Sequence, residues 1–204
     1  MKDSKELIRF IAANKNRPTR IYVGANDGML HSFDENLVEQ WAFIPPSVLP
    51  KLRGMINETG VAINGGKSNS IFSVDGPIAI KDVYISSATN TSPQWKTVLM
   101  GGLGWGGNSY YALDITDPAN PKHLFTFNND VPNKVINYWN ANGDKSTFAY
   151  GTACTGVEYS FDYSKLGGAW SRPTIMLMPY GQSQRWVAAF GGGYAGGESV
   201  SGTG

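Results

Sequence analysis

The residues best suited to bind a metal ion are Asn140, Asn142 and Asp144, which alternate along the segment NANGDKS. A calcium loop of the EF-hand type uses oxygen ligands at its first, third and fifth positions, and this segment offers them. The same loop needs glycine at position six and an acidic side chain at position twelve. This chain has Lys145 and Gly151 there, so the three residues are only weak candidates for a calcium site.

Other residue types that support catalysis or metal binding are few and scattered. His31 and His123 fall in different predicted strands, and the single cysteine is Cys154. A zinc site needs three or four ligands close together, and none is indicated here. A lone cysteine allows no internal disulfide, so we expect it to be a small buried side chain or to pair outside this chain. We find no nucleophile elbow and predict that the protein is not an enzyme.

The segment Asn26-Asp27-Gly28 separates two predicted strands. Asn or Asp followed by Gly supplies the positive φ angles of a tight hairpin, so we interpret the three residues as a turn. A loop that contacts a ligand or partner is the alternative. The glycine-rich segments GGLGWGG and GGGYAGG lack the Gly-Lys-Ser/Thr ending of a phosphate-binding loop and are also interpreted as turns.

Two pairs of residues recur at matched positions. Asp34 in LHSFDEN aligns with Asp114 in YYALDITD, and Pro77 in GPIAI aligns with Pro173 in RPTIM. An inward-facing carboxylate near a propeller axis could bind a cation, but an aspartate at a strand end more often caps the following turn. Because a repeated unit repeats its scaffold, we predict a structural role for all four.

The composition indicates a β-rich protein. Glycine accounts for 25 of 204 residues and aromatic residues for 12%, and both favour strands joined by tight turns. With 17 basic and 16 acidic residues, the net charge of +1 gives no bulk attraction to nucleic acid or an anionic membrane. No segment has the apolar length of a transmembrane helix, and no signal peptide is visible.

The predicted elements fall into three similar units after a short amphipathic helix near residues 3–13. Strands are expected in unit 1 at 20–24, 29–34 and 37–44, in unit 2 at 76–85, 96–101, 109–115 and 123–127, and in unit 3 at 172–178 and 185–190. Two long insertions, 45–70 and 128–168, separate them, the first with one helical turn near 48–52. Repeated antiparallel units are typical of a propeller. We therefore predict an all-β fold: a partial β-propeller of about two and a half antiparallel blades with long inserted loops, at 20–204, preceded by a helical lead-in at 1–19.

Long blocks of this sequence resemble one family. YVGANDGMLHSFD with WAFIPPSVLPKL, then VDGPIAIKDVYI with WKTVLMGGLGWGGNSYYALDITDP, then WSRPTIMLM with RWVAAFGGGY are similar to the C-terminal propeller of PilC/PilY proteins. The resemblance spans roughly residues 5–197 and includes the helical lead-in ELIRFIAANKNRP.

The resemblance implies a non-enzymatic module of an exported protein of the periplasm, outer membrane, cell surface or pilus tip. Such proteins act in type IV pilus assembly, restraint of retraction, twitching motility and surface attachment. The implied partners are pilins or minor pilins and host or abiotic surfaces, with no nucleic acid. Calcium is expected for the full family domain, through an Asp/Asn-rich loop beyond the part matched here, and no cofactor is expected in this chain.

Two tryptophans are candidates for a partner contact. Trp105 and Trp139 fall in predicted polar loops, where an exposed aromatic side chain often contributes to an interface. Two other functions remain open. SFDENLVEQWAF is similar to the tryptophan-docking repeat of quinoprotein (PQQ) dehydrogenases, although one cysteine cannot form their usual disulfide. A carbohydrate-binding propeller is the other alternative.

Overall fold

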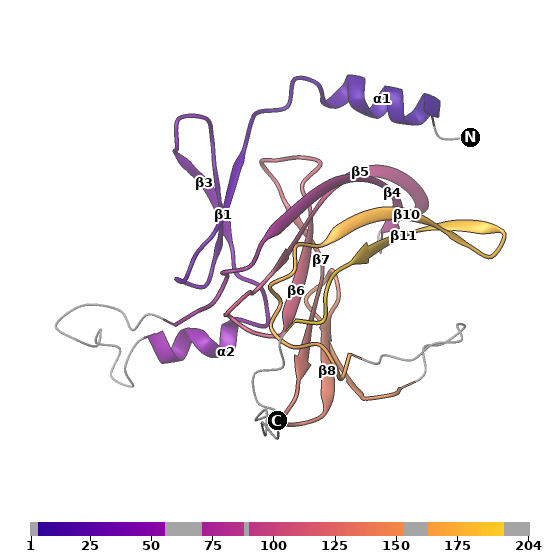
Figure 1. Ribbon diagram of the computed structural model, residues 1–204. Coiled ribbons are helices and arrows are strands. Elements are labelled where there is room, and N and C mark those ends of the chain that lie inside the picture. The colour runs from indigo at the N-terminus through magenta and orange to yellow at the C-terminus, as the bar shows by residue number, and fades with distance from the viewer. Residues whose placement is uncertain (1–3, 56–70, 88–89, 153–162, 194–204) are drawn as a thin grey trace, which may run out of the picture.

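The structure is a computed structural model of the 204-residue chain that describes residues 4–55, 71–87, 90–152 and 163–193. Helix α1 (Ser4–Asn14) precedes three antiparallel sheets (Figure 1). The first sheet contains β1 (Ile21–Gly24), β2 (Leu30–Phe33) and β3 (Glu39–Phe43). The short helices α2 (Leu49–Leu52) and η1 (Arg53–Met55) follow it. The helix near the N-terminus, the three strands and the helical turn are therefore confirmed.

The second sheet has six strands in sequential order. They are β4 (Ile78–Ser87), β5 (Asn90–Gly102), β6 (Ser109–Asp114), β7 (Lys122–Asp130), β8 (Val135–Trp139) and β9 (Lys145–Ala149). The third sheet is the hairpin of β10 (Thr174–Tyr180) and β11 (Ser183–Ala189). Among the described residues, each strand of the three sheets pairs antiparallel with its neighbour in the sequence, which is the order of a blade meander.

The prediction of one long loop at 128–168 was wrong for its first half. This segment contains the end of β7 and all of β8 and β9. Its asparagines are poor strand formers in isolation, but cross-strand contacts compensate for them in the sheet. Asn137 is buried, and its Oδ1 accepts a hydrogen bond from the Thr147 hydroxyl on β9 at 3.0 Å. Residues 153–162 of this loop, which include Cys154, and residues 56–70 of the first insertion lie outside the described residues.

The six-stranded sheet is packed between the other two sheets. Along β5 and β6, alternate side chains point to opposite faces, as the pleat requires. Leu99, Tyr111 and Leu113 join a cluster with residues of the first sheet. Met100 and Tyr110 face the other way, toward the β10–β11 hairpin. All six residues of β6 are buried, so this strand lies at the centre of a three-layer stack.

Hydrogen bonds join the first sheet to the second. The indole Nε1 of Trp41 on β3 donates to the carbonyl oxygen of Pro118, after β6, at 2.9 Å. The N–H of Val74, before β4, donates to the carbonyl oxygen of Ala25, after β1, at 3.2 Å. The chain therefore consists of a short helix followed by successive antiparallel sheets that stack on one another. This arrangement confirms the predicted partial propeller.

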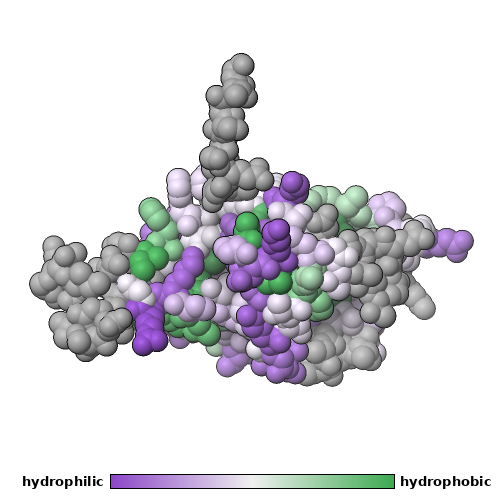
Figure 2. Space-filling view, turned by 90° about the horizontal axis from the view of Figure 1, so that it is seen from below, coloured by the Kyte–Doolittle hydropathy of each residue, from purple (hydrophilic) through white to green (hydrophobic). Residues whose placement is uncertain are grey.

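The surface of the described residues combines hydrophobic and hydrophilic side chains. Figure 2 shows hydrophobic residues in separate patches among hydrophilic ones on the face seen from below. No helix in the described part of the chain is both long and apolar enough to span a membrane.

Candidate functional site

Asp34 and Asp114 form the same turn at the ends of β2 and β6. The Asp34 Oδ1 accepts the backbone N–H of Asn36 at 2.9 Å and of Val38 at 3.0 Å. The Asp114 Oδ1 accepts the backbone N–H of Thr116 at 3.0 Å and its hydroxyl at 2.6 Å. In both turns one carboxylate oxygen holds the chain that follows, which is the geometry of an Asx turn.

Asp114 differs from Asp34 in its second oxygen. The Lys96 ammonium group donates to the Asp114 Oδ2, and both side chains are largely buried. Burial raises the pKa of Asp114, but the hydrogen bonds from Lys96 and Thr116 lower it by more, so the net pKa lies below the usual value. Asp114 is therefore a charged member of a buried ion pair as well as a turn residue.

A cavity of about 690 Å³ brings Asp114 together with Asn140 and Asn142. Lys96 also lines this cavity, and the rings of Phe125 and Tyr138 form an apolar section of its wall. The cavity lies beside β7 and β8. The sequence predicted a loop from residue 128 onward, so it could not indicate this grouping.

The three weak calcium candidates occupy the turn between β8 and β9. The Asn140 Oδ1 accepts the backbone N–H groups of Asn142 at 2.9 Å and Asp144 at 3.0 Å. The Asn140 amide also donates to the Asp144 Oδ2 at 3.1 Å. These oxygens bond within their own turn, and no three acidic, histidine or cysteine side chains gather as metal ligands among the residues described. Calcium binding stays a prediction for the full domain.

The Asn26-Asp27-Gly28 segment forms the turn between β1 and β2. Gly28 has a φ of 98°, which glycine adopts without strain. The Asp27 Oδ1 accepts the Met29 N–H at 3.0 Å, and the Asn26 Oδ1 accepts the Ser73 N–H at 3.1 Å. Asn26 thereby ties the first hairpin to the segment that enters β4.

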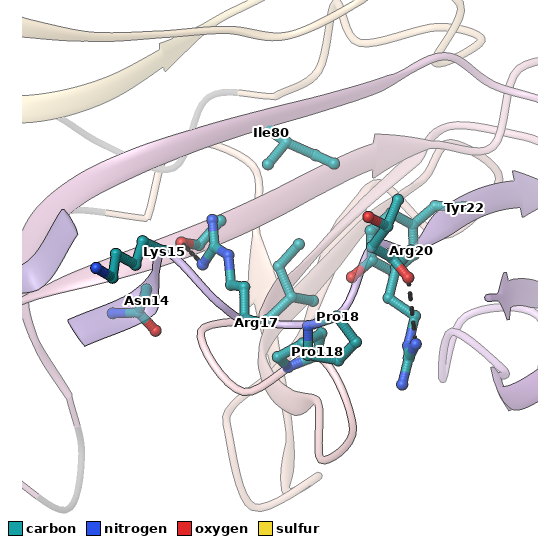
Figure 3. A pocket seen from close by; sticks show the side chains of 11 residues that line it. Asn14, Lys15, Arg17, Pro18, Arg20, Tyr22, Ile80 and Pro118 are labelled. Atoms are coloured by element: carbon teal, nitrogen blue, oxygen red, sulfur yellow. Dashed lines mark hydrogen bonds between the residues drawn. The ribbon is translucent and has the colours of Figure 1, made fainter. Parts of the chain in front are cut away.

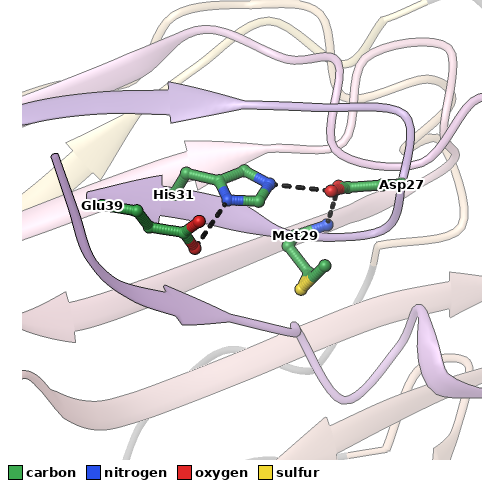
Figure 4. Close-up of polar contacts among 4 residues, drawn as sticks. All are labelled: Asp27, Met29, His31 and Glu39. Atoms are coloured by element: carbon green, nitrogen blue, oxygen red, sulfur yellow. Dashed lines mark hydrogen bonds and ion pairs between the residues drawn. The ribbon is translucent and has the colours of Figure 1, made fainter. Parts of the chain in front are cut away.

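His31 lies between two carboxylates (Figure 4). Its Nε2 is 2.9 Å from the Asp27 Oδ2, and its Nδ1 is 3.1 Å from the Glu39 Oε1. Burial lowers the pKa of His31, but the contacts with Glu39 and Asp27 raise it above the usual value. Sequence reasoning missed this group, because Glu39 reaches His31 only through the pairing of β2 with β3.

Pro77 and Pro173 precede the first strands of the second and third sheets. Pro77 comes directly before β4, and its carbonyl oxygen accepts the Gly102 N–H at 3.3 Å. Pro173 is buried directly before β10. Proline has no backbone N–H, so it fits the start of a strand, where no N–H donor is needed for pairing.

Trp105 is the most exposed tryptophan in a cluster of three aromatic rings. Phe72, Trp105 and Trp170 are 53%, 63% and 42% exposed and come from three different loops. The ring centroids of Trp105 and Trp170 are 4.5 Å apart, and those of Trp105 and Phe72 are 5.8 Å apart. We call these three residues the aromatic cluster.

The loop that carries Trp105 is held tightly against its neighbours. A Cβ atom on Gly106 would lie 1.7 Å from the Ser73 carbonyl oxygen, so only glycine allows this approach. The Gly104 N–H donates to the Ala169 carbonyl oxygen at 3.0 Å. The aromatic cluster is therefore presented by anchored loops rather than by free chain.

The prediction that Trp139 lies in a loop was wrong. Trp139 is the last residue of β8, is half-buried, and pairs with Lys145 on β9. The Lys145 ammonium group is 5.4 Å from the centroid of the indole ring, a cation–π contact. A role for Trp139 in binding a partner stays a prediction.

Comparisons with known proteins all point to one family. The sequence profile of the PilY1 beta-propeller domain matches residues 1–202. The type IV pilus biogenesis factor PilY1 of Pseudomonas aeruginosa strain PAO1 is 45% identical over 116 residues, which are 57% of this chain and 9% of that protein. PilY1 of strain UCBPP-PA14 is 34% identical over 179 residues, which are 87% of this chain and 12% of that protein.

More distant comparisons agree. A type IV pilus biogenesis factor PilY1 homolog of Xylella fastidiosa is 31% identical over 187 residues, covering 91% of this chain and 10% of that protein. The crystal structure of the Pseudomonas aeruginosa PilY1 C-terminal domain superimposes with a TM-score of 0.55 at 29% identity, covering 91% of this chain and 27% of that one. The chain thus spans about a tenth of the length of its curated relatives, and it belongs to the PilY1 β-propeller domain family.

Proposed function

We propose that this chain is a non-enzymatic scaffold module of a type IV pilus biogenesis factor and that it contacts pilus components through the aromatic cluster. The relatives named above are type IV pilus biogenesis factors, which supports the pilus-related role. The observation that carries the contact is the 63% exposure of Trp105 on an anchored loop. Exposed, well-supported tryptophans are over-represented among the residues that dominate interface energies.

In this proposal the protein is exported and acts at the cell envelope or the pilus tip. Its partners are pilins or minor pilins, and it contributes to assembly, restraint of retraction and attachment to surfaces. We expect any calcium site of the complete domain to lie elsewhere than the turn at Asn140, because the Asn140 Oδ1 already accepts two backbone N–H groups. The buried Lys96–Asp114 pair and the matched Asp turns act as scaffold.

The test is Trp105→Ala in the full-length protein, expressed from its own gene in a piliated bacterium. Leu177→Ala is the matched control, because Leu177 on β10 is a similarly exposed apolar side chain at 42%, outside the aromatic cluster. We expect normal protein levels for both variants and fewer surface pili only for Trp105→Ala, measured by shearing and quantifying pilin. Equal piliation of both variants would contradict the proposal. A glycan array probed with the purified protein tests the carbohydrate-binding alternative, which Trp105-dependent binding would favour.

A further inference from the structure

A pocket of about 340 Å³ lies where the link from α1 to β1 crosses the second sheet. Figure 3 shows Arg17 and Tyr22 on two sides of it, with Ile80 above and Pro18 and Pro118 below. The first-sheet side of β4 and β5 forms its back wall, through Ile80 and Thr97. The pocket thus combines apolar walls with a strongly basic rim.

Three cationic side chains line the pocket, namely Lys15, Arg17 and Arg20, and no acidic residue does. None of the three takes part in an ion pair within the part of the chain that the structure describes. Lys15 and Arg17 follow the C-terminus of α1, where positive charge complements the helix dipole. That effect fades within the last turn, so it does not account for Arg20.

Arg17 is held in a fixed position. Its Nη1 donates to the Thr97 hydroxyl at 2.7 Å, and this hydroxyl donates to the Asp82 Oδ1 at 2.6 Å. Asp82 is the nearest carboxylate in this chain of contacts, but it lies behind Thr97 and does not line the pocket. The other guanidinium donors of Arg17 have no protein acceptor among the described residues.

Arg20 and Tyr22 supply two further donors. The Arg20 Nη1 donates to the Thr19 carbonyl oxygen at 3.2 Å, while its Nε is buried without any hydrogen-bond partner. An unpaired buried donor is unfavourable, so a rotation of the side chain toward an anion in the pocket would be favoured. Burial raises the pKa of Tyr22, and the charges of Arg20 and Arg17 partly offset that rise, so the phenol keeps its proton. Figure 3 shows the Arg20 side chain extending away from Arg17, so Arg20 would reach an anion bound by Arg17 only after this rotation.

We propose that this pocket binds the carboxylate of an acidic side chain of a partner protein, with Arg17, Arg20 and the Tyr22 hydroxyl as donors. Planar guanidinium groups match the two oxygens of a carboxylate, and Ile80, Pro18 and Pro118 suit the apolar chain beside it. A phosphate fits less well, because phosphate sites commonly use backbone N–H groups at a helix N-terminus. Here the helix presents its C-terminus, and Pro18 has no N–H. None of the three residues of the aromatic cluster lines this pocket.

The test is an NMR titration of the ¹⁵N-labelled 204-residue chain that follows the arginine Nε–H signals. The probe is the peptide acetyl-Leu-Glu-Leu-amide, compared with acetyl-Leu-Gln-Leu-amide and with inorganic phosphate at constant ionic strength. We expect saturable shifts of the Arg17 and Arg20 signals with the glutamate peptide. Because charge-assisted hydrogen bonds are about twice as strong as neutral ones, we expect at least about fivefold weaker binding of the glutamine peptide.

Substitutions complete the test. Arg17→Gln and Arg20→Gln should each weaken binding by about tenfold, and Arg20→Lys, which keeps the charge and the fold but loses the planar fork, should weaken it by about threefold. Arg9→Gln is the matched control: it removes the same charge from an exposed position on α1 outside the pocket and should leave the affinity within about twofold. Equal binding of the two peptides, or equal losses for Arg9→Gln and Arg20→Lys, would overturn the proposal. Tighter binding of phosphate than of the glutamate peptide would overturn the carboxylate assignment.

Discussion

His31 forms hydrogen bonds to both of its carboxylate neighbours only when both ring nitrogens carry protons. Its folded-state pKa is raised, so the stabilisation is complete below about pH 6.5, the unfolded value, and is lost as pH rises through the folded pKa. Relative to His31→Gln, we expect the free energy of unfolding of the natural protein to fall by up to about 1 kcal/mol between about pH 6 and pH 8.

Urea unfolding at a series of pH values measures this difference. His123, whose pKa is lowered by burial, titrates in both proteins and therefore cancels in the comparison. In the variant Glu39→Gln, the free energy of unfolding should fall over a lower pH range, because one of the two carboxylates that raise the pKa of His31 is gone. Parallel pH profiles for the natural protein and His31→Gln would show that the Asp27–His31–Glu39 contact contributes nothing.

Asp34 and Asp114 make the same turn but differ in charge pairing. Asparagine keeps the turn-forming oxygen, so Asp34→Asn should change the free energy of unfolding by less than about 0.5 kcal/mol. Asp114→Asn leaves the Lys96 ammonium group, whose side chain is 16% exposed, without its partner. We expect a loss of about 2–3 kcal/mol, measured by urea unfolding. Equal effects of the two substitutions would mean that the ion pair has no energetic role.

At the scale of elements, the Trp41 indole joins the first sheet to the turn after β6. Trp41→Phe removes the hydrogen bond to the Pro118 carbonyl oxygen and should cost about 1 kcal/mol. The loss should appear in hydrogen exchange as faster exchange of β1 to β3, with β5 and β6 unchanged. Trp139→Phe is the control, since Trp139 lies in β8 away from that junction. Faster exchange throughout the second sheet would contradict this local role.

The sequence indicated elements well where a turn signal bounds a short, apolar strand. The Asn26-Asp27-Gly28 turn and the matched Asp34 and Asp114 turns locate β2 and β6 because their geometry is set within a few residues. The strands β8 and β9 were missed because their segment is rich in asparagine, and the Asn137 side chain on β8 finds its partner, Thr147, only across the sheet on β9. The His31 group was missed because Glu39 reaches His31 only through the pairing of β2 with β3. The aromatic cluster and the basic pocket were missed because each joins residues far apart in the sequence, such as Phe72 with Trp105 and Arg17 with Thr97.

At the scale of the whole molecule, the second sheet is covered by the first sheet on one face and by β10–β11 on the other. The aromatic cluster is carried by three loops at the surface rather than by the stacked strands. The chain spans about a tenth of its relatives' length. The central claim is that the aromatic cluster contacts a pilus component in the assembled system.

Site-specific photo-crosslinking in living cells tests this claim most directly. A benzoylphenylalanine placed at position 105 of this chain, within the full-length protein, should crosslink to a pilin or minor pilin, identified by mass spectrometry. The same photoreactive residue at position 177, which is exposed on β10 outside the aromatic cluster, should give no such product. Absence of a pilin adduct at position 105 in a piliated strain, or equal adducts from both positions, would contradict the account.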